Sequence, residues 1–316
     1  MPASGMTLQA LLDELQAAEE AGAEALGLWL ATCDDPALRG GLRVIRARDI
    51  AHARLARRRL EAIGATPGQA APRQLQSLCG VLAASDVSNR SKLTILLSRF
   101  PARADDPVPD VVRQLDDDET RAMLESIHDD DRASLRWLRD VGEVLAPGPA
   151  IRPAPDASMV RFLDAYRAAE RAAADVVGAW RDVCRSPGLR GGLDTIAARE
   201  ATHAELLEAR VQELGGVPGA HVDDAVRERA HAHFGAADVS DDSKLARALA
   251  RYADDAAVTA PLDPVIAEIA GDQETREMLR LVAAGEHATF AWLRSYWHAV
   301  SARPREVSLR ILDGGR

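Results

Sequence analysis

The feature that most constrains the fold of this chain is an internal repeat. Residues 12–64 align without gaps with residues 163–215, and further matches follow in the same order. Leu-Arg-Gly-Gly-Leu occurs at 38–42 and at 189–193, and Trp-Leu-Arg at 137–139 and at 292–294. The offset between matching residues grows only from 151 to 155. Each copy therefore has the length of an ordinary domain, and the sequence predicts a tandem duplication.

The boundary between the copies is marked by composition. Prolines cluster between residues 147 and 155, which is typical of a stiff linker. We expect copy one at residues 1–145, a proline-rich linker at 146–157, copy two at 158–300 and a C-terminal tail at 301–316.

The apolar pattern of both copies is helical. Aromatic residues are only 4% of the chain, and alanine is abundant, which favours helices over strands. Leucines and other apolar residues recur at helical spacing in three long segments of each copy, and the third of four segments is broken into two pieces. The second helix is expected to begin after the Gly-Gly pair and to end at Gly64 or Gly215. The prediction is an all-α chain of two tandem four-helix bundles, each with a broken third helix.

Ionisable residues interrupt the apolar faces at matching positions. Each copy has an acid on its first helix, an acid and a histidine three residues apart on its second, and an acid on its fourth. In copy one these are Glu19, Asp49, His52 and Asp131; in copy two they are Glu170, Glu200, His203 and Glu286. An acid and an imidazole at i and i+3 project from one helical face, so both can reach one ion. Buried charges are costly unless they are paired or bind a metal, so these residues are candidate metal ligands.

These helices and ligands resemble the ferritin-like superfamily, which includes ferritins and rubrerythrins. The resemblance covers about residues 7–145 and 158–300. It implies a bound iron or manganese ion and oxidase or ferroxidase chemistry, which would make the protein a metal-dependent oxidoreductase. Copy two is the better site, because copy one has two of the shorter Asp side chains.

The sequence departs from the complete family pattern in two places. Ser134 and Thr289 stand where that pattern has a second histidine, and the third helix offers no matching acid. The alternative interpretation is a metal-free helical scaffold or interaction protein whose acid and histidine clusters form self-satisfied polar networks.

The two lysines of the chain, Lys92 and Lys244, occupy equivalent positions among 39 basic residues. One hypothesis is that each ammonium reaches inward and neutralises the acids; the other is a lysine that keeps its charge in water.

Charge and composition exclude some functions. A net charge of −10 argues against nucleic-acid binding, and no apolar run reaches the about 20 residues that span a membrane. Three cysteines without paired motifs and an N-terminus without a signal-peptide pattern indicate a cytoplasmic protein. We expect a pseudo-dimeric monomer or a homo-oligomer. Residues 307–312 resemble the docking peptides of ferritin-like cargo in encapsulin shells.

Overall fold

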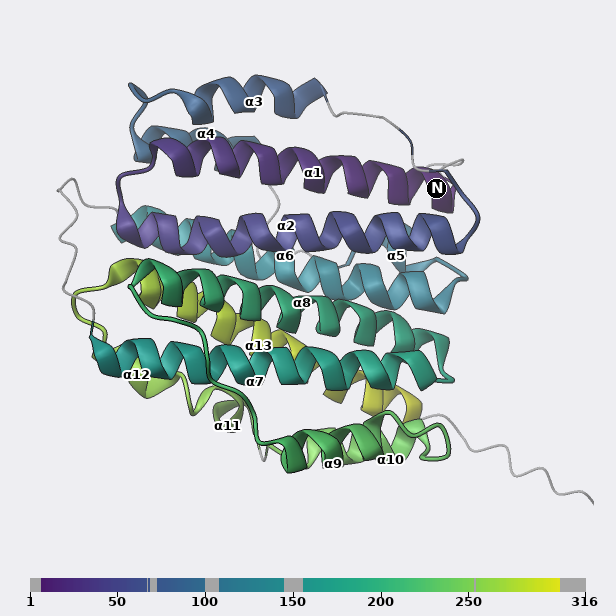
Figure 1. Cartoon of the computed structure of the whole chain (residues 1–316). Coiled ribbons are helices and arrows are strands. Elements are labelled where there is room, and N and C mark those ends of the chain that lie inside the picture. The colour runs from purple at the N-terminus through teal and green to yellow at the C-terminus, as the bar shows by residue number, and fades with distance from the viewer. Residues whose placement is uncertain are drawn as a thin grey trace, which may run out of the picture.

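The computed structural model describes residues 7–66, 68, 73–99, 108–144, 156–252 and 254–301 (Figure 1). These residues form thirteen helices and no strand, so the all-α prediction is confirmed. Residues 146–155 of the predicted linker and residues 302–316 of the predicted tail lie outside the described residues.

Six long helices form the main body of the described fold. They are α1 (Leu8–Thr32), α2 (Pro36–Ala62), α6 (Asp118–Val144), α7 (Ala157–Val183), α8 (Pro187–Glu213) and α13 (Gln273–Ser301). Seven shorter helices complete the described fold: α3 (Arg73–Ala83), α4 (Asn89–Arg99), α5 (Asp110–Arg113), α9 (Asp224–Phe234), α10 (Asp241–Leu249), α11 (Asp255–Thr259) and α12 (Asp263–Glu268). The pairs α3–α4 and α9–α10 are the predicted broken segments, whereas α5, α11 and α12 were not predicted.

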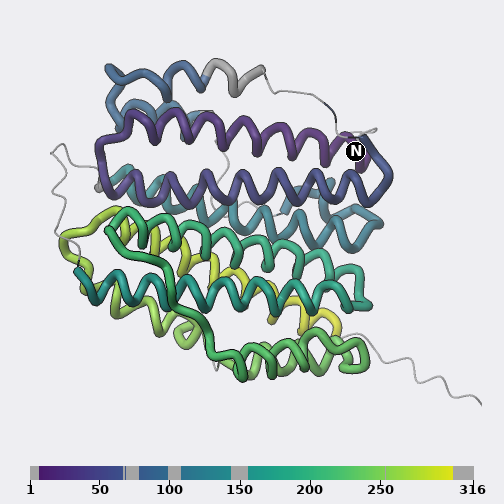
Figure 2. The backbone as a smooth tube through the Cα atoms, viewed as in Figure 1, coloured from purple at the N-terminus to yellow at the C-terminus, as the bar shows by residue number. Residues whose placement is uncertain are grey.

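The long helices run side by side in two layers (Figures 1 and 2). The contacts of one layer run in the order α3, α1, α2, α8, α7 and α9, and α6 and α13 lie together in the layer behind. Helix α6 contacts α8 more extensively than it contacts α2, and α13 contacts α2 more extensively than α8. The two halves of the chain therefore interlock through α6 and α13, the last long helix of each half.

The hydrophobic core crosses this junction. One cluster of buried side chains joins Leu42 and Ile45 of α2 to Leu279 and Val282 of α13. None of the described helices combines the length and the apolar character needed to cross a membrane.

Local sequence signals set the helix ends. The side chains of Thr7, Asp35, Asp156 and Ser186 accept backbone N–H groups at the starts of α1, α2, α7 and α8. Gly64 and Gly215 have φ angles of 74° and 79° directly after α2 and α8. Glycine adopts this left-handed backbone without strain, so the two predicted C-terminal caps are confirmed.

The Gly-Gly pairs do not precede the second helices, so that prediction was wrong. Helix α2 begins at Pro36 and α8 at Pro187, which places both pairs inside the helices. A Cβ atom on Gly40 would overlap the backbone carbonyl of Glu274 in α13, and one on Gly41 would overlap the ring of Trp137. Gly191 and Gly192 make the matching close approaches to Glu119 of α6 and to Trp292. The glycines are needed for close helix crossing rather than for a turn.

We predict that Gly40→Ala lowers the free energy of unfolding by about 1–3 kcal/mol, because the new methyl group must push α13 away from α2. The matched control is Gly178→Ala in α7, where an added Cβ meets nothing within 4 Å. That control should be stabilising by about 0.5–1 kcal/mol, since alanine is the better helix former. Urea unfolding of both variants measures the difference, and equal effects would contradict the close crossing.

Candidate metal centre

Three helices bring the predicted ligands of copy two together. Glu170 lies on α7, Glu200 and His203 on α8, and Glu286 on α13. Each offers one ligand atom, and these four atoms lie within 4.8 Å of one another. His203 Nδ1 is 3.4 Å from Glu170 Oε2 and 3.3 Å from Glu286 Oε1. We call this group the α7–α8–α13 cluster.

The α7–α8–α13 cluster contains buried polar atoms without hydrogen-bond partners, as expected of a site that holds a cation. His203 is 0% exposed, and neither of its ring nitrogens makes a hydrogen bond within the described part of the chain. Glu170 Oε2 and Glu286 Oε1 are likewise buried without a hydrogen-bond partner there. Buried polar atoms are rarely left unpaired, because each loses its hydration. Ligands bonded at about 2.0–2.2 Å to one ion lie about 3–3.5 Å apart, as the measured pairs do.

The carboxyls of this cluster strongly disfavour ionising together. Burial and the nearby charge of Glu286 raise the pKa of Glu170 to about 8. Burial and the charges of Glu286 and Glu170 also raise the pKa of Glu200 well above its usual range. Without a cation the cluster therefore retains protons at neutral pH, and a bound cation would displace them.

The predicted ligands of copy one assemble only in part. Ligand atoms of Glu19 on α1, His52 on α2 and Asp131 on α6 lie within 4.8 Å of one another, and Asp49 is not part of that group. The Asp49 carboxyl lies beside Gly22, where an added Cβ would be 2.7 Å from its Oδ2 atom. We call Glu19, His52 and Asp131 the α1–α2–α6 cluster.

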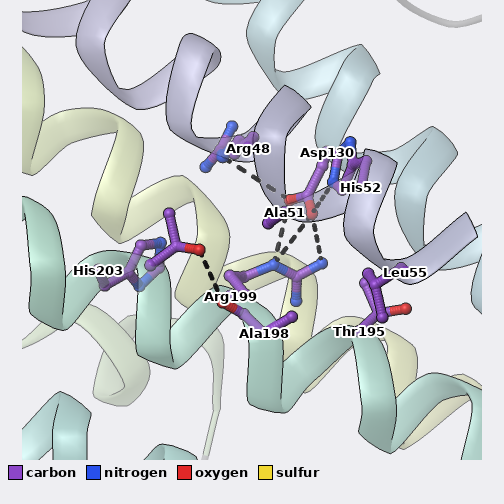
Figure 3. A pocket seen from close by; sticks show the side chains of 10 residues that line it. Arg48, Ala51, His52, Leu55, Asp130, Thr195, Ala198, Arg199 and His203 are labelled. Atoms are coloured by element: carbon purple, nitrogen blue, oxygen red, sulfur yellow. Dashed lines mark hydrogen bonds and ion pairs between the residues drawn. The ribbon is translucent and has the colours of Figure 1, made fainter. Parts of the chain in front are cut away.

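The sequence analysis missed the most deeply buried acid near these residues, Asp130. It is 2% exposed, and Arg199 of α8 donates to both of its carboxylate oxygens at 3.0–3.2 Å (Figure 3). Arg48 Nε lies 4.0 Å from Asp130, and His52 Nε2 lies 3.3 Å from it. These arginines hold the pKa of Asp130 well below its usual range even though burial acts to raise it. The signal in the sequence was that Arg48 and Arg199 directly precede the acids of their helices in both copies.

Asp130 changes the chemistry of His52. Burial acts to lower the pKa of His52, but the carboxylates of Asp130 and Glu19 outweigh it, so this pKa is raised well above 6.5. The imidazole therefore holds its proton more tightly than an exposed histidine does. A metal would have to displace this proton, and the α1–α2–α6 cluster offers three ligand residues where the α7–α8–α13 cluster offers four, which makes it the poorer metal site.

The other half has no equivalent of Asp130 beside its histidine, His203. Gly285 precedes Glu286 as Asp130 precedes Asp131. A Cβ on Gly285 would lie 2.9 Å from Cε1 and 3.0 Å from Nε2 of His203. The glycine thus leaves the Nε2 side of His203 without an equivalent of Asp130, whereas Glu170 and Glu286 lie on its Nδ1 side.

The two residues that stand in place of the second histidine, Thr289 and Ser134, each accept a hydrogen bond from an arginine. Thr289 Oγ1 accepts a hydrogen bond of 2.7 Å from Arg199, and Ser134 Oγ accepts one of 3.3 Å from Arg48. A guanidinium therefore lies at each of these positions.

Both lysine hypotheses are wrong. Lys92 and Lys244 are 1% and 0% exposed, so neither keeps its charge in water. Lys92 Nζ donates to Thr32 Oγ1 at 2.7 Å, and Thr32 is thirteen residues beyond Glu19 on α1. At about 1.5 Å per residue the ammonium is about 20 Å from the acids. Lys244 lies near Cys184 and Asp241 at the corresponding end of α7.

Comparison with protein-family models, with curated proteins and with solved structures finds no match for this chain. The functional argument therefore depends on the geometry of its own residues.

We predict that Asp130→Asn lowers the free energy of unfolding by about 3–5 kcal/mol, because it leaves the buried guanidinium of Arg199 without its counter-ion. Asp129→Asn is the matched control, since the Asp129 side chain is 40% exposed. It should change stability by no more than about 0.5 kcal/mol. Similar losses for both variants in urea unfolding would refute the role of the ion pair.

A second prediction concerns pH. Between about pH 4.5 and about pH 8 the folded, metal-free protein holds a proton on Glu170 that the unfolded chain has released. The contribution of Glu170 to the free energy of unfolding is therefore complete at low pH and is lost as the pH rises through about 8. The thermal midpoint of metal-free protein should therefore fall more steeply toward alkaline pH than that of Glu170→Gln. Identical slopes would show that Glu170 does not titrate in this range.

Proposed function

We propose that this chain is a ferritin-like metal-binding protein, built as two tandem four-helix units that share their central helices. The α7–α8–α13 cluster binds one iron or manganese ion in this proposal. The carrying observation is the convergence of Glu170, Glu200, His203 and Glu286 on one point, where both ring nitrogens of His203 and one carboxyl oxygen each of Glu170 and Glu286 are buried without a hydrogen-bond partner among the described residues.

One ion rather than two follows from the charge around the cluster. In the ferritin-like pattern, Thr289 would be the histidine that serves a second ion. Here Arg199 donates to Thr289 at 2.7 Å, so a positive charge already occupies that neighbourhood. A second divalent cation would be repelled by it.

The ligand types favour iron or manganese. Three carboxylates and one imidazole are oxygen and nitrogen ligands, which suit Mn²⁺ and Fe²⁺, and the cluster contains no thiolate. Charge balance agrees, because a divalent cation would offset the mutual repulsion of the three acids, of which Glu170 and Glu200 are buried and Glu286 is 12% exposed.

An oxidase or ferroxidase activity is the matching reaction. The metal would supply one-electron oxidation and reduction when it is bound. Around it, Glu170 and Glu200 share a hydrogen bond and hold a proton that can leave as positive charge increases. Tyr166 lies against Glu170, and the ring of Phe290 packs 4.5 Å from that of Tyr252, centroid to centroid. These aromatic rings limit the access of water to the cluster.

The test is metal content per chain, measured by elemental analysis of protein from cells supplied with iron and manganese. We expect about one ion per chain, and a loss of at least about tenfold in affinity for Glu200→Gln and for His203→Ala. The matched controls are Asp49→Asn and His52→Ala, which alter the same positions of the other half and should leave the metal content unchanged.

The alternative function, a metal-free scaffold, predicts a different result. Metal would then be sub-stoichiometric and insensitive to Glu200→Gln and His203→Ala. Full metal content without oxygen consumption on addition of Fe²⁺ would retain the metal site and reject the oxidase activity.

A further inference from the structure

The half of the chain with the poorer metal site contains a cavity that is partly open to solvent. It measures about 420 Å³ and lies among α1, α2, α3, α4 and α6. Most of its wall is apolar and includes Leu15, Leu26, Leu96, Leu135 and Leu138. This volume falls within the range of about 300–1,000 Å³ that is typical of small-molecule sites.

One wall of this cavity is acidic. Glu19, Asp49 and Asp131 all line it, and Asp131 is the most accessible acid of the two clusters. The Asp131 side chain is 45% exposed, whereas that of its counterpart Glu286 is 12% exposed.

A buried histidine that does not itself line the cavity lies beside two of these acids. His52 is 2% exposed, and its Nδ1 atom makes no hydrogen bond within the described part of the chain. This atom lies 3.6 Å from Glu19 Oε2 and 3.8 Å from Asp131 Oδ1. His52 is already paired with Asp130 on its other side, so it balances at most part of the acidic charge.

The cavity depends on residues that differ between the halves. Leu15 corresponds to Tyr166 and Leu135 corresponds to Phe290. In the other half, Tyr166 packs beside its acid cluster and Phe290 packs edge-on against Tyr252. Smaller side chains therefore leave open in one half the space that aromatic rings take up in the other.

We propose that this cavity binds an apolar organic amine, with its ammonium at Glu19, Asp49 and Asp131 and its hydrocarbon body among the leucines. The remaining ionisable lining groups are His128 and Arg132, so the three acids outnumber the positive charges on the wall. An ammonium donates charge-assisted hydrogen bonds to carboxylates, whereas a carboxylate ligand would be repelled. A neutral ligand would bury these acids without pairing them.

The test compares three ligands that share one hydrocarbon body. Octylamine, octanol and octanoate are titrated into the full chain by calorimetry, before and after loading with Mn²⁺. Octylamine should bind at least about tenfold more tightly than octanol, and octanoate should bind most weakly. Asp131→Asn should reduce the preference for octylamine over octanol to within about threefold. Metal loading should leave octylamine binding unchanged, so the result is independent of the proposed metal function.

A second variant takes its residues from the other half of the chain. Leu15→Tyr combined with Leu135→Phe should fill the cavity and abolish octylamine binding, while circular dichroism and Mn²⁺ binding at the α7–α8–α13 cluster stay unchanged. Equal binding of octanol and octylamine, preference for octanoate, or no binding of any of the three would overturn the proposal. So would the loss of one of two bound Mn²⁺ ions in Asp131→Asn, because the acids would then hold a metal.

Discussion

The ion pair between Arg199 of α8 and Asp130 of α6 is the interaction on which the rest of this structure depends. Both side chains are almost fully buried, and they lie in opposite halves of the chain. A buried charge without a partner costs several kcal/mol, so neither half is expected to keep its packing without the other. The close crossings at Gly40 and Gly191 also join the halves, because each brings the second helix of one half against the last long helix of the other.

The same pair makes two similar clusters chemically different. Asp130 pairs with Nε2 of His52 and raises the pKa of this histidine, whereas Gly285 leaves Nε2 of His203 without such a partner among the described residues. The two clusters also differ in the free volume around them. A cavity lies beside Asp131, whereas aromatic rings fill the space beside Glu286. These differences in charge and space support different proposed ligands for the two halves, a metal ion in one and an apolar amine in the other.

Much of this arrangement could be predicted from the sequence, because it depends on local pattern. Helical periodicity gave the long helices, and the residues at i and i+3 placed Glu200 beside His203. The missed features depend on contacts between distant segments. Asp130 and Arg199 are 69 residues apart, and an arginine on a helix is normally assigned to the surface. The Gly-Gly pairs were taken for turns because the helix that crosses them lies more than 200 residues away for Gly40. The burial of Lys92 and Lys244 likewise depends on the packing of the helix ends rather than on local pattern.

The central claim is that one cluster of this chain holds a metal ion and its counterpart does not. Anomalous X-ray scattering from crystals grown with Mn²⁺ tests it most directly, because it locates the ion without relying on activity. The account predicts one strong anomalous peak between Glu170, Glu200, His203 and Glu286, and none between Glu19, His52 and Asp131. A peak of equal height at both clusters, or at the second cluster alone, would contradict it.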